Sequence, residues 1–234
     1  MSDKERVKTY IDDLDSQMSG GIPEDHVVLI SGNPGTFKSS ISYNILYHNA
    51  LENGRKGLYI SFQQSRESLE TQFRSLNMDP KDVEDKITIV DVGYLRETVE
   101  TNPDDWVEVF KRYVENIRAT TDYELLVVDS LTTLEMISNI EDRRETLFHI
   151  FEWLRDIQGL TSFLLTERAR TKETLREEEF LADGTIILSK ERLGKVETRR
   201  YLAIDKMRST KHKTSYFTLL FDGERFQVTR VISD

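Results

Sequence analysis

The sequence predicts an α/β protein with a mostly parallel central sheet flanked by helices and with C-terminal antiparallel strands on one edge. Between Val27 and Thr166, short apolar runs alternate with amphipathic segments of helical periodicity, a pattern typical of a parallel sheet covered on both faces. After Asp183, strand-like runs follow one another without a helical segment between them. A glycine-rich turn over residues 32–39 separates the first apolar run from the first helical segment, a position typical of a phosphate-binding loop.

The parallel part of the sheet is predicted from five short runs rich in aliphatic and β-branched residues. Four other segments carry apolar residues at helical spacing, and residues 102–105 (Asn-Pro-Asp-Asp) are typical of a helix cap and first turn. The predicted strands are Val27–Ser31, Leu58–Phe62, Ile87–Asp91, Leu125–Asp129 and Thr161–Thr166. The predicted helices are Ser39–Leu51, Arg66–Leu76, Trp106–Arg118 and Arg144–Asp156.

The C-terminal part is predicted as an antiparallel extension whose last two strands are joined by the turn Asp222-Gly223. Its strands are Thr185–Ser189, Arg199–Met207, Tyr216–Phe221 and Phe226–Val231.

The most polar block of the chain, Arg168–Glu179, lies between the two parts and is predicted to be a mobile loop or an exposed helix. Such a block is usually a solvated face. It is basic at its start, with Arg168, Arg170 and Lys172, and acidic at its end, with Glu177, Glu178 and Glu179.

Length and composition limit the class of protein. With 234 residues, 38% of them hydrophobic and 32% charged, the chain can bury one substantial core, and we expect residues 1–234 to form a single domain. A formal net charge of −10 argues against a dedicated nucleic-acid-binding protein, because such binding needs clustered Lys and Arg. The sequence has no cysteine, no apolar run long enough to span a bilayer and no signal-peptide pattern, so we expect a soluble, cytoplasmic protein.

The turn after the first strand matches the Walker A pattern G-x-x-x-x-G-K-[ST] except at one position. The backbone N–H groups of such a turn and the positive end of the following helix converge on one spot, which favours a phosphate. Lys38 is placed to reach the β- and γ-phosphates of a nucleotide, and Ser39 to bind the Mg²⁺ that bridges them. The predicted nucleotide contacts are Gly32, Asn33, Pro34, Gly35, Thr36, Phe37, Lys38, Ser39 and Ser40.

Phe37 stands where the pattern asks for glycine. Since a positive φ costs a non-glycine residue about 1–2 kcal/mol, we expect a negative φ at Phe37, whose amide can still face a phosphate. The alternative interpretation is a Gly/Pro turn that carries a lysine by chance. The strand before the turn, the helix after it and a second acidic site downstream favour the phosphate-binding loop.

The predicted strand Leu125–Asp129 is apolar and ends in a carboxylate. Asp129 is expected to hold Mg²⁺ through its water shell, because Mg²⁺ prefers octahedral oxygen ligation and keeps several waters. The alternative is that Asp129 only caps the following turn. Ser39 and Asp129 together are the predicted magnesium site.

Several segments, in their order and spacing, carry a resemblance that covers nearly the whole chain. They are Asp12-Asp13-Leu14-Asp15 with Gly20-Gly21-Ile22-Pro23, Gly57-Leu58-Tyr59-Ile60-Ser61-Phe62 with Ser65-Arg66-Glu67-Ser68-Leu69, Asp129-Ser130-Leu131-Thr132, Thr166-Glu167-Arg168, and Lys206-Met207-Arg208-Ser209-Thr210-Lys211-His212. With them the sequence resembles the KaiC-like branch of the RecA superfamily of ATPases, in particular its single-domain archaeal members. The resemblance implies a RecA-like P-loop fold that binds ATP with Mg²⁺ and hydrolyses it.

Gln63-Gln64 departs from the resembled family, which usually has Glu-Glu or Glu-Gln at this place. In RecA-like enzymes this first glutamate orients and deprotonates the attacking water. Glutamine can hold a water but cannot take its proton, and losing a general base costs about 10²–10⁴-fold in rate. We therefore expect tight ATP binding and slow hydrolysis. Gln63 is then either the natural residue of a slow switch protein or a substitution introduced to trap ATP.

The resemblance also implies a homo-oligomer with ATP at the subunit boundaries, as a ring or filament and most simply a hexamer. In the resembled family, residues matching Lys206 and Arg208 reach the γ-phosphate of the neighbouring subunit, and their spacing places both on one face of a predicted edge strand. The spacing alone also fits an exposed strand with ordinary surface charges. Thr166 and Glu167 end a predicted strand where RecA-like proteins place a γ-phosphate sensor, and Thr166 is the candidate nucleotide contact, although a polar strand end needs no such role. His212 is a candidate contact across the interface, although a solvated histidine is the simpler interpretation.

Three functions fit this set of residues. The leading one is a P-loop ATPase that works as an oligomeric nucleotide-driven switch, read by a protein partner at the ring face or channel. The alternative is a RecA-like recombination or repair protein that binds single-stranded DNA, against which the net charge and the acidic residues 177–179 argue. Autokinase activity of the circadian-clock kind is not expected, because Glu179-Phe180 stands where that activity needs a Ser/Thr pair.

Overall fold

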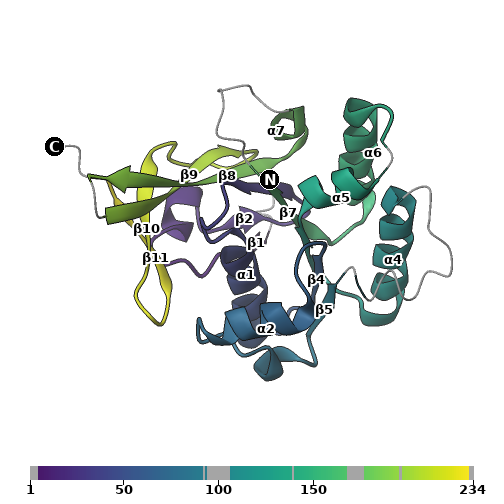
Figure 1. Cartoon of the computed structure of the whole chain (residues 1–234), viewed down its shortest axis with the longest axis horizontal. Helices are drawn as coiled ribbons and strands as arrows, with labels where there is room; N and C mark the ends of the chain where they lie inside the picture. Colours follow the sequence, from purple (N-terminus) through teal and green to yellow (C-terminus); the bar gives the residue numbers. More distant parts are fainter. Residues whose placement is uncertain are drawn as a thin grey trace.

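The computed structural model of the chain describes residues 5–91, 93, 106–138, 140–167, 177–194 and 197–231. Within these residues, nine strands form one sheet in the order β11-β10-β9-β8-β3-β7-β6-β4-β5 (Figure 1). Pairing is parallel from β8 to β5 and antiparallel from β8 to β11. The strands are β3 (Val27–Gly32), β4 (Gly57–Ser61), β5 (Ile87–Asp91), β6 (Leu125–Asp129), β7 (Thr161–Glu167), β8 (Gly184–Leu193), β9 (Glu197–Met207), β10 (Tyr216–Phe221) and β11 (Phe226–Arg230), while β1 (Arg6–Val7) and β2 (Ile22–Pro23) pair with each other.

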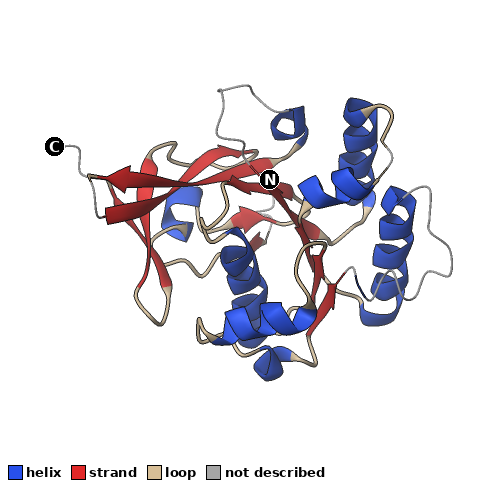
Figure 2. Ribbon diagram, viewed as in Figure 1, coloured by secondary structure: helices blue, strands red, loops and turns tan. Residues whose placement is uncertain are grey.

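Helices cover both faces of the parallel part of the sheet (Figure 2). Val28 and Ile30 point into one core, which is shared with the helix that follows β3, whereas Val27 and Leu29 point into a second core on the other face. A central parallel strand is apolar on both sides for this reason. The helices are α1 (Lys38–Asn53), α2 (Arg66–Arg74), α4 (Trp106–Thr121), α5 (Leu131–Ile137), α6 (Arg143–Asp156) and α7 (Glu177–Leu181), with short 3-10 turns at Asp15–Met18 and Pro80–Val83.

Local capping explains where several helices begin. The Ser65 hydroxyl accepts from the Ser68 N–H before α2, and the Asp142 carboxylate accepts from the Glu145 N–H before α6. Ser130 does the same for α5, where its hydroxyl accepts from the Thr133 N–H. The helix α5 was not predicted, because seven residues are too few for helical periodicity to show.

The predicted α/β architecture is confirmed, and the nine predicted strands and four predicted helices have ends within four residues of those observed. One detail differs. β8 pairs in parallel with β3, so the antiparallel extension begins between β8 and β9. Residues 102–105, predicted as a helix cap and first turn, lie outside the described residues.

The acidic end of the polar block is not the solvated face that was predicted. Glu178 belongs to α7 and is 1% exposed, with Oε2 2.9 Å from Arg143 Nη2. Burial of this carboxylate is stabilised by that ion pair, which joins α7 to α6. The predicted basic start, Arg168, Arg170 and Lys172, lies outside the described residues. Across the described helices, none is long and apolar enough to cross a membrane.

Candidate functional site

A tight turn joins β3 to α1 at the carboxyl edge of the sheet. A Cβ on Gly32 would lie 2.4 Å from the Leu188 carbonyl oxygen and 2.9 Å from Thr36 Oγ1, so only glycine fits there. The Thr36 hydroxyl donates to the Asn33 carbonyl at 2.8 Å and closes the turn. In the part of the chain that the structure describes, no side chain caps α1, so its first backbone N–H groups are available to an anion.

Phe37 has φ +74°, so the prediction of a negative φ was wrong. The residue adopts the left-handed conformation immediately before α1, and its ring is held by two partners from the C-terminal strands. The Phe226 ring lies 5.5 Å away between centroids, and the Arg200 guanidinium carbon lies 4.0 Å from the Phe37 centroid. Arg200 Nε also donates to the Gly35 carbonyl at 3.0 Å. These contacts offset the cost of about 1–2 kcal/mol that the left-handed conformation carries.

At position 37, glycine should give a more stable protein than alanine, which is the reverse of the usual order of stability. Phe37→Ala removes the ring contacts but keeps the strained backbone, so we expect the free energy of unfolding to fall by about 1–2 kcal/mol. Phe37→Gly removes the same contacts and also the strain, and should be more stable than Phe37→Ala by about 1 kcal/mol. Urea denaturation of the three proteins measures both differences. An alanine variant as stable as the glycine variant would contradict the left-handed conformation.

Lys38 extends back over the turn. Its Nζ donates to the Gly32 carbonyl at 2.8 Å and to the Asn33 carbonyl at 3.3 Å. Burial lowers the pKa of Lys38, while the negative charges of Glu167 and Asp129 oppose this shift. The ammonium therefore lies between loop carbonyls and two carboxylates, a place where phosphate oxygens would be stronger partners.

Asp129 ends β6 and is 6% exposed. Tyr59 donates its hydroxyl to Asp129 Oδ2 at 2.6 Å. Burial raises the pKa of Asp129, against hydrogen bonds from Ser39 and Tyr59 and the charge of Lys38. The alternative role, a cap for the following turn, falls to Ser130, which caps α5. A hydroxyl and a carboxylate that meet beside the turn are the hard oxygen donors that Mg²⁺ prefers, so Ser39 and Asp129 fit this metal.

These groups share one cavity of about 420 Å³, which lies where the loop and the ends of β4, β6 and β7 meet. An open parallel sheet binds its ligand at this edge. The cavity is lined by Pro34, Gly35, Phe37, Lys38, Ser39, Ser40, Gln63, Gln64, Gln72, Ser75, Leu76, Asp129, Ser130 and Glu167. The cavity therefore brings together Lys38, the two magnesium-site residues and the Gln63-Gln64 pair.

Gln63 follows β4 and points across the cavity toward the start of α5. Its Nε2 donates to Thr133 Oγ1 at 2.7 Å and lies 3.4 Å from both Ser130 Oγ and Glu167 Oε1. The backbone of Gln64 is fixed by Ser61, whose hydroxyl accepts from the Gln64 N–H and donates to its carbonyl. The sequence did not reveal Thr133 as a partner of Gln63, because the two residues meet only through the pairing of β4 with β6.

Thr166 and Glu167 end β7, and the structure separates their surroundings. Thr166 is 2% exposed, and its Oγ1 has no hydrogen-bond partner among the described residues; it is not one of the cavity-lining residues. Glu167 does line the cavity. A sensor role for Thr166 stays a prediction.

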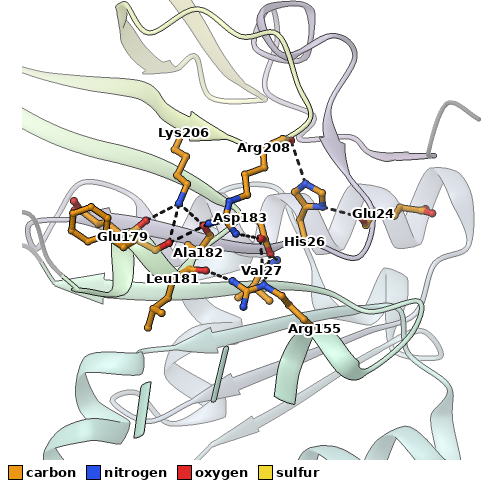
Figure 3. A network of polar contacts seen from close by, with 11 residues as sticks. Glu24, His26, Val27, Arg155, Glu179, Leu181, Ala182, Asp183, Lys206 and Arg208 are labelled. Atoms are coloured by element: carbon orange, nitrogen blue, oxygen red, sulfur yellow. Dashed lines mark hydrogen bonds and ion pairs between the residues drawn. The ribbon is translucent and has the colours of Figure 1, made fainter. Parts of the chain in front are cut away.

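Lys206 and Arg208 form a second polar cluster, away from the loop, at the carboxyl end of α7 (Figure 3). Lys206 Nζ donates to the carbonyls of Glu179, Phe180 and Ala182 at 3.1, 3.2 and 2.7 Å. Arg208 Nη1 lies 2.7 Å from Asp183 Oδ1. Both side chains thus point to the same segment, as their spacing predicted.

The strand that carries Lys206 is not an edge strand, which corrects the prediction, because β9 lies between β8 and β10. Apolar alternation defines a strand but not its neighbours in the sheet. β10 pairs only with residues 200–203 of β9, so the Lys206 end extends past it. His212 lies in the chain after β9, with Nδ1 3.1 Å from the Thr210 carbonyl. Among the described residues, the lining of the cavity does not include Lys206, Arg208 or His212.

Asp183 joins this cluster to the core. Its carboxylate accepts from the Val27 N–H at 3.1 Å and contacts Arg155 at 3.1 Å as well as Arg208. Burial acts to raise the pKa of Asp183, but the Val27 hydrogen bond and the two guanidinium groups outweigh it and leave this pKa below its ordinary value. Arg208 is therefore held by an ionised carboxylate within its own chain.

Comparison with known proteins gives one consistent result. A family profile described as "ATPase: KaiC" matches residues 7–229. A UPF0273 protein of Thermotoga maritima is 32% identical over 222 residues, with 88% of each chain covered. The circadian clock oscillator protein KaiC of Picosynechococcus sp. is 29% identical over 234 residues, which cover 94% of this chain but 44% of that protein. The crystal structure of a KaiC-like protein from Pyrococcus horikoshii OT3 superposes with a TM-score of 0.81 at 28% identity, covering 97% of this chain and 99% of the other.

Proposed function

The chain belongs to the KaiC-like ATPase family, and from this premise we propose that it is an ATP-binding P-loop ATPase that works as an oligomeric, nucleotide-driven switch. The observation that carries the proposal is the shared cavity. Lys38 and Ser39 from the start of α1, Asp129 from β6 and Gln63 from the end of β4 all line it. This set has the composition of a site for a metal-bound triphosphate.

Each residue has a chemical task in this proposal. The turn and the free N–H groups of α1 bind phosphate oxygens, and Lys38 moves its ammonium from the loop carbonyls to the β- and γ-phosphates of the substrate. Ser39 would hold Mg²⁺ through its hydroxyl, and Asp129 would hold it through its water shell. Mg²⁺, when bound, neutralises charge on the leaving phosphate oxygens.

Gln63 makes hydrolysis slow. Gln63 lines the cavity, and in this proposal its amide holds a water near the γ-phosphate. An amide does not take up the proton that the water must lose. The contacts that set ATP affinity come from the loop, Lys38 and the magnesium site, and are independent of Gln63. We therefore expect a long-lived ATP-bound state, which is the property a switch requires.

The position of three further polar residues supports an oligomer. Within the described residues, Lys206, Arg208 and His212 do not line the cavity of their own chain; Lys206 is near the end of β9, and Arg208 and His212 follow this strand. We propose that they complete the cavity of a neighbouring copy in a homo-oligomeric ring, most simply a hexamer. Each subunit of this ring would be a single domain. A protein partner would then recognise the ring in its ATP-bound form.

The proposal is tested by ATP affinity and by mass in solution. Isothermal titration with ATP and Mg²⁺ should show binding by the unchanged chain, and Lys38→Ala should weaken it by about 10²-fold through loss of charged hydrogen bonds. Lys111→Ala is the matched control, since Lys111 is paired with Glu108 on α4 and does not line this cavity. Sedimentation with ATP and Mg²⁺ should show an oligomer. Absence of ATP binding, or a monomer under these conditions, would refute the proposed function.

A further inference from the structure

Glu167 brings a carboxylate to the cavity from a strand that the Walker motifs do not include. It is the last residue of β7 and pairs in register with Gly32, the residue that opens the phosphate-binding turn. Its backbone N–H donates to Thr132 Oγ1 at 3.1 Å, which ties the strand end to the first turn of α5. The position of this carboxylate is therefore set by the central sheet and not by a free loop.

The side chain of Glu167 meets that of Gln63. The distance from Gln63 Nε2 to Glu167 Oε1 is 3.4 Å. A carboxylate accepts hydrogen bonds, so the nitrogen end of the amide must face Glu167, and Thr133 Oγ1 at 2.7 Å holds the amide in that orientation. The Gln63 carbonyl oxygen then remains to accept from a third group. A water molecule that donates to Gln63 Oε1 and to the Glu167 carboxylate would be held between the two side chains.

Charged groups around Glu167 connect it to the substrate site. Glu167 lines the same cavity as Lys38 and Asp129. Burial lowers the pKa of Lys38 and raises the pKa of Asp129, and the nearby Glu167 charge opposes the first shift and adds to the second. Lys38 from α1 and Asp129 from β6 are the charged side chains that also line the cavity among the described residues, together with the uncharged Gln63. Glu167 is thus the carboxylate of this cavity that the predicted magnesium site does not use.

We propose that Glu167 is the general base of this chain, in place of the glutamate that position 63 lacks. The inference rests on the proposed ATPase function. The oxygen of a water positioned by Gln63 forms a bond to the γ-phosphorus, and the bond between that phosphorus and the β,γ-bridging oxygen breaks to release ADP. The proton lost by the water goes to the Glu167 carboxylate and from there to solvent.

Two substitutions separate this role from a merely structural one. Glu167→Gln should lower single-turnover hydrolysis by about 10²-fold or more, because Asp129, the carboxylate that remains among the described lining residues, belongs to the predicted magnesium site. The exchanged pair Gln63→Glu with Glu167→Gln keeps the same net charge and one amide facing one carboxylate. It should restore hydrolysis at least to the level of the unchanged chain, because the base then stands at position 63.

ATP affinity is the second readout and does not depend on turnover. Titration of Glu167→Gln with ATP and Mg²⁺ should give an affinity near that of the unchanged chain, and nucleotide extracted after incubation should be ATP instead of ADP. Glu152→Gln is the matched control, because Glu152 is an exposed carboxylate on α6 outside the cavity. It should behave as the unchanged chain in both assays.

Two results would overturn the inference. Hydrolysis by Glu167→Gln at the unchanged rate would show that Glu167 takes no proton. An exchanged pair as inactive as Glu167→Gln, with ATP affinity retained, would show that Glu167 acts through folding of the β7 end. If the unchanged chain bound no ATP at all, the proposed function itself would fail, which is a different outcome.

Discussion

Arg208→Ala is expected to leave ATP affinity nearly unchanged while it lowers single-turnover hydrolysis by about 10³–10⁵-fold or prevents assembly. The fall is expected because, in the proposed oligomer, Arg208 of a neighbouring copy would stabilise charge on the transferred phosphate. The proposed ATP contacts, which are the loop, Lys38 and the predicted magnesium site, lie on another part of the same chain. The measurement is best made in the Gln63→Glu background, where the expected faster hydrolysis makes a large fall in rate measurable.

The geometry of the cluster supplies a control for Arg208→Ala. Arg155 and Arg208 contact the same carboxylate of Asp183, with closest distances of 3.1 and 2.7 Å. Arg155→Ala therefore disturbs the same ion pair from α6 without removing the residue proposed to reach the neighbour. It should lower hydrolysis far less than Arg208→Ala, and sedimentation with ATP should show the same oligomer. Equal losses in the two variants would mean that the ion pair to Asp183, and not a cation in trans, was responsible.

The fold was predictable from the sequence wherever a feature is local. Each parallel strand is a short apolar run bounded by a turn, so β5 and β6 have the predicted ends. The phosphate-binding turn, Lys38 and Asp129 were found in the same way, because the motif and its strand are contiguous in the chain.

The features that were missed or wrong depend on partners far away in the sequence. The φ of Phe37 is tolerated because of Arg200 and Phe226, and Glu178 is buried because Arg143 from α6 meets it. The place of β9 inside the sheet depends on strand pairing, which apolar alternation does not encode. Such contacts between distant residues override local preference.

The candidate site shows the same difference between local motifs, which the sequence predicts, and contacts of distant residues, which it does not. Gln63 was identified as the position of a missing base, but its contact with Glu167 spans 104 residues and needs the ends of two strands to meet. Glu167 was noted with Thr166 at the strand end where RecA-like proteins place a γ-phosphate sensor, and not as a base. The local motifs therefore predict a site for the triphosphate, while the contact between the two residues proposed to govern its turnover is found only in the folded chain.

Gln63→Glu is expected to raise single-turnover hydrolysis by about 10²-fold, the lower end of the range for a positioned general base, because the proposed base Glu167 already contributes. The new carboxylate would stand beside the Ser130 and Thr133 hydroxyls, which can donate to it in place of accepting from the amide. It would also lie near Glu167, and repulsion between the two carboxylates acts against the gain.

Gln63→Asp separates the chemistry of a base from the effect of an added charge. Aspartate brings the same charge into the cavity but is one methylene shorter, so it should reach the water poorly and give a much smaller gain than glutamate. Rates are measured with enzyme in excess over ATP, and affinity is titrated separately, because an added negative charge near the triphosphate weakens binding without changing the chemical step. No gain with glutamate would remove Gln63 from the catalytic position. Equal gains with aspartate and glutamate would attribute the effect to charge alone and leave position 63 without a role in proton transfer.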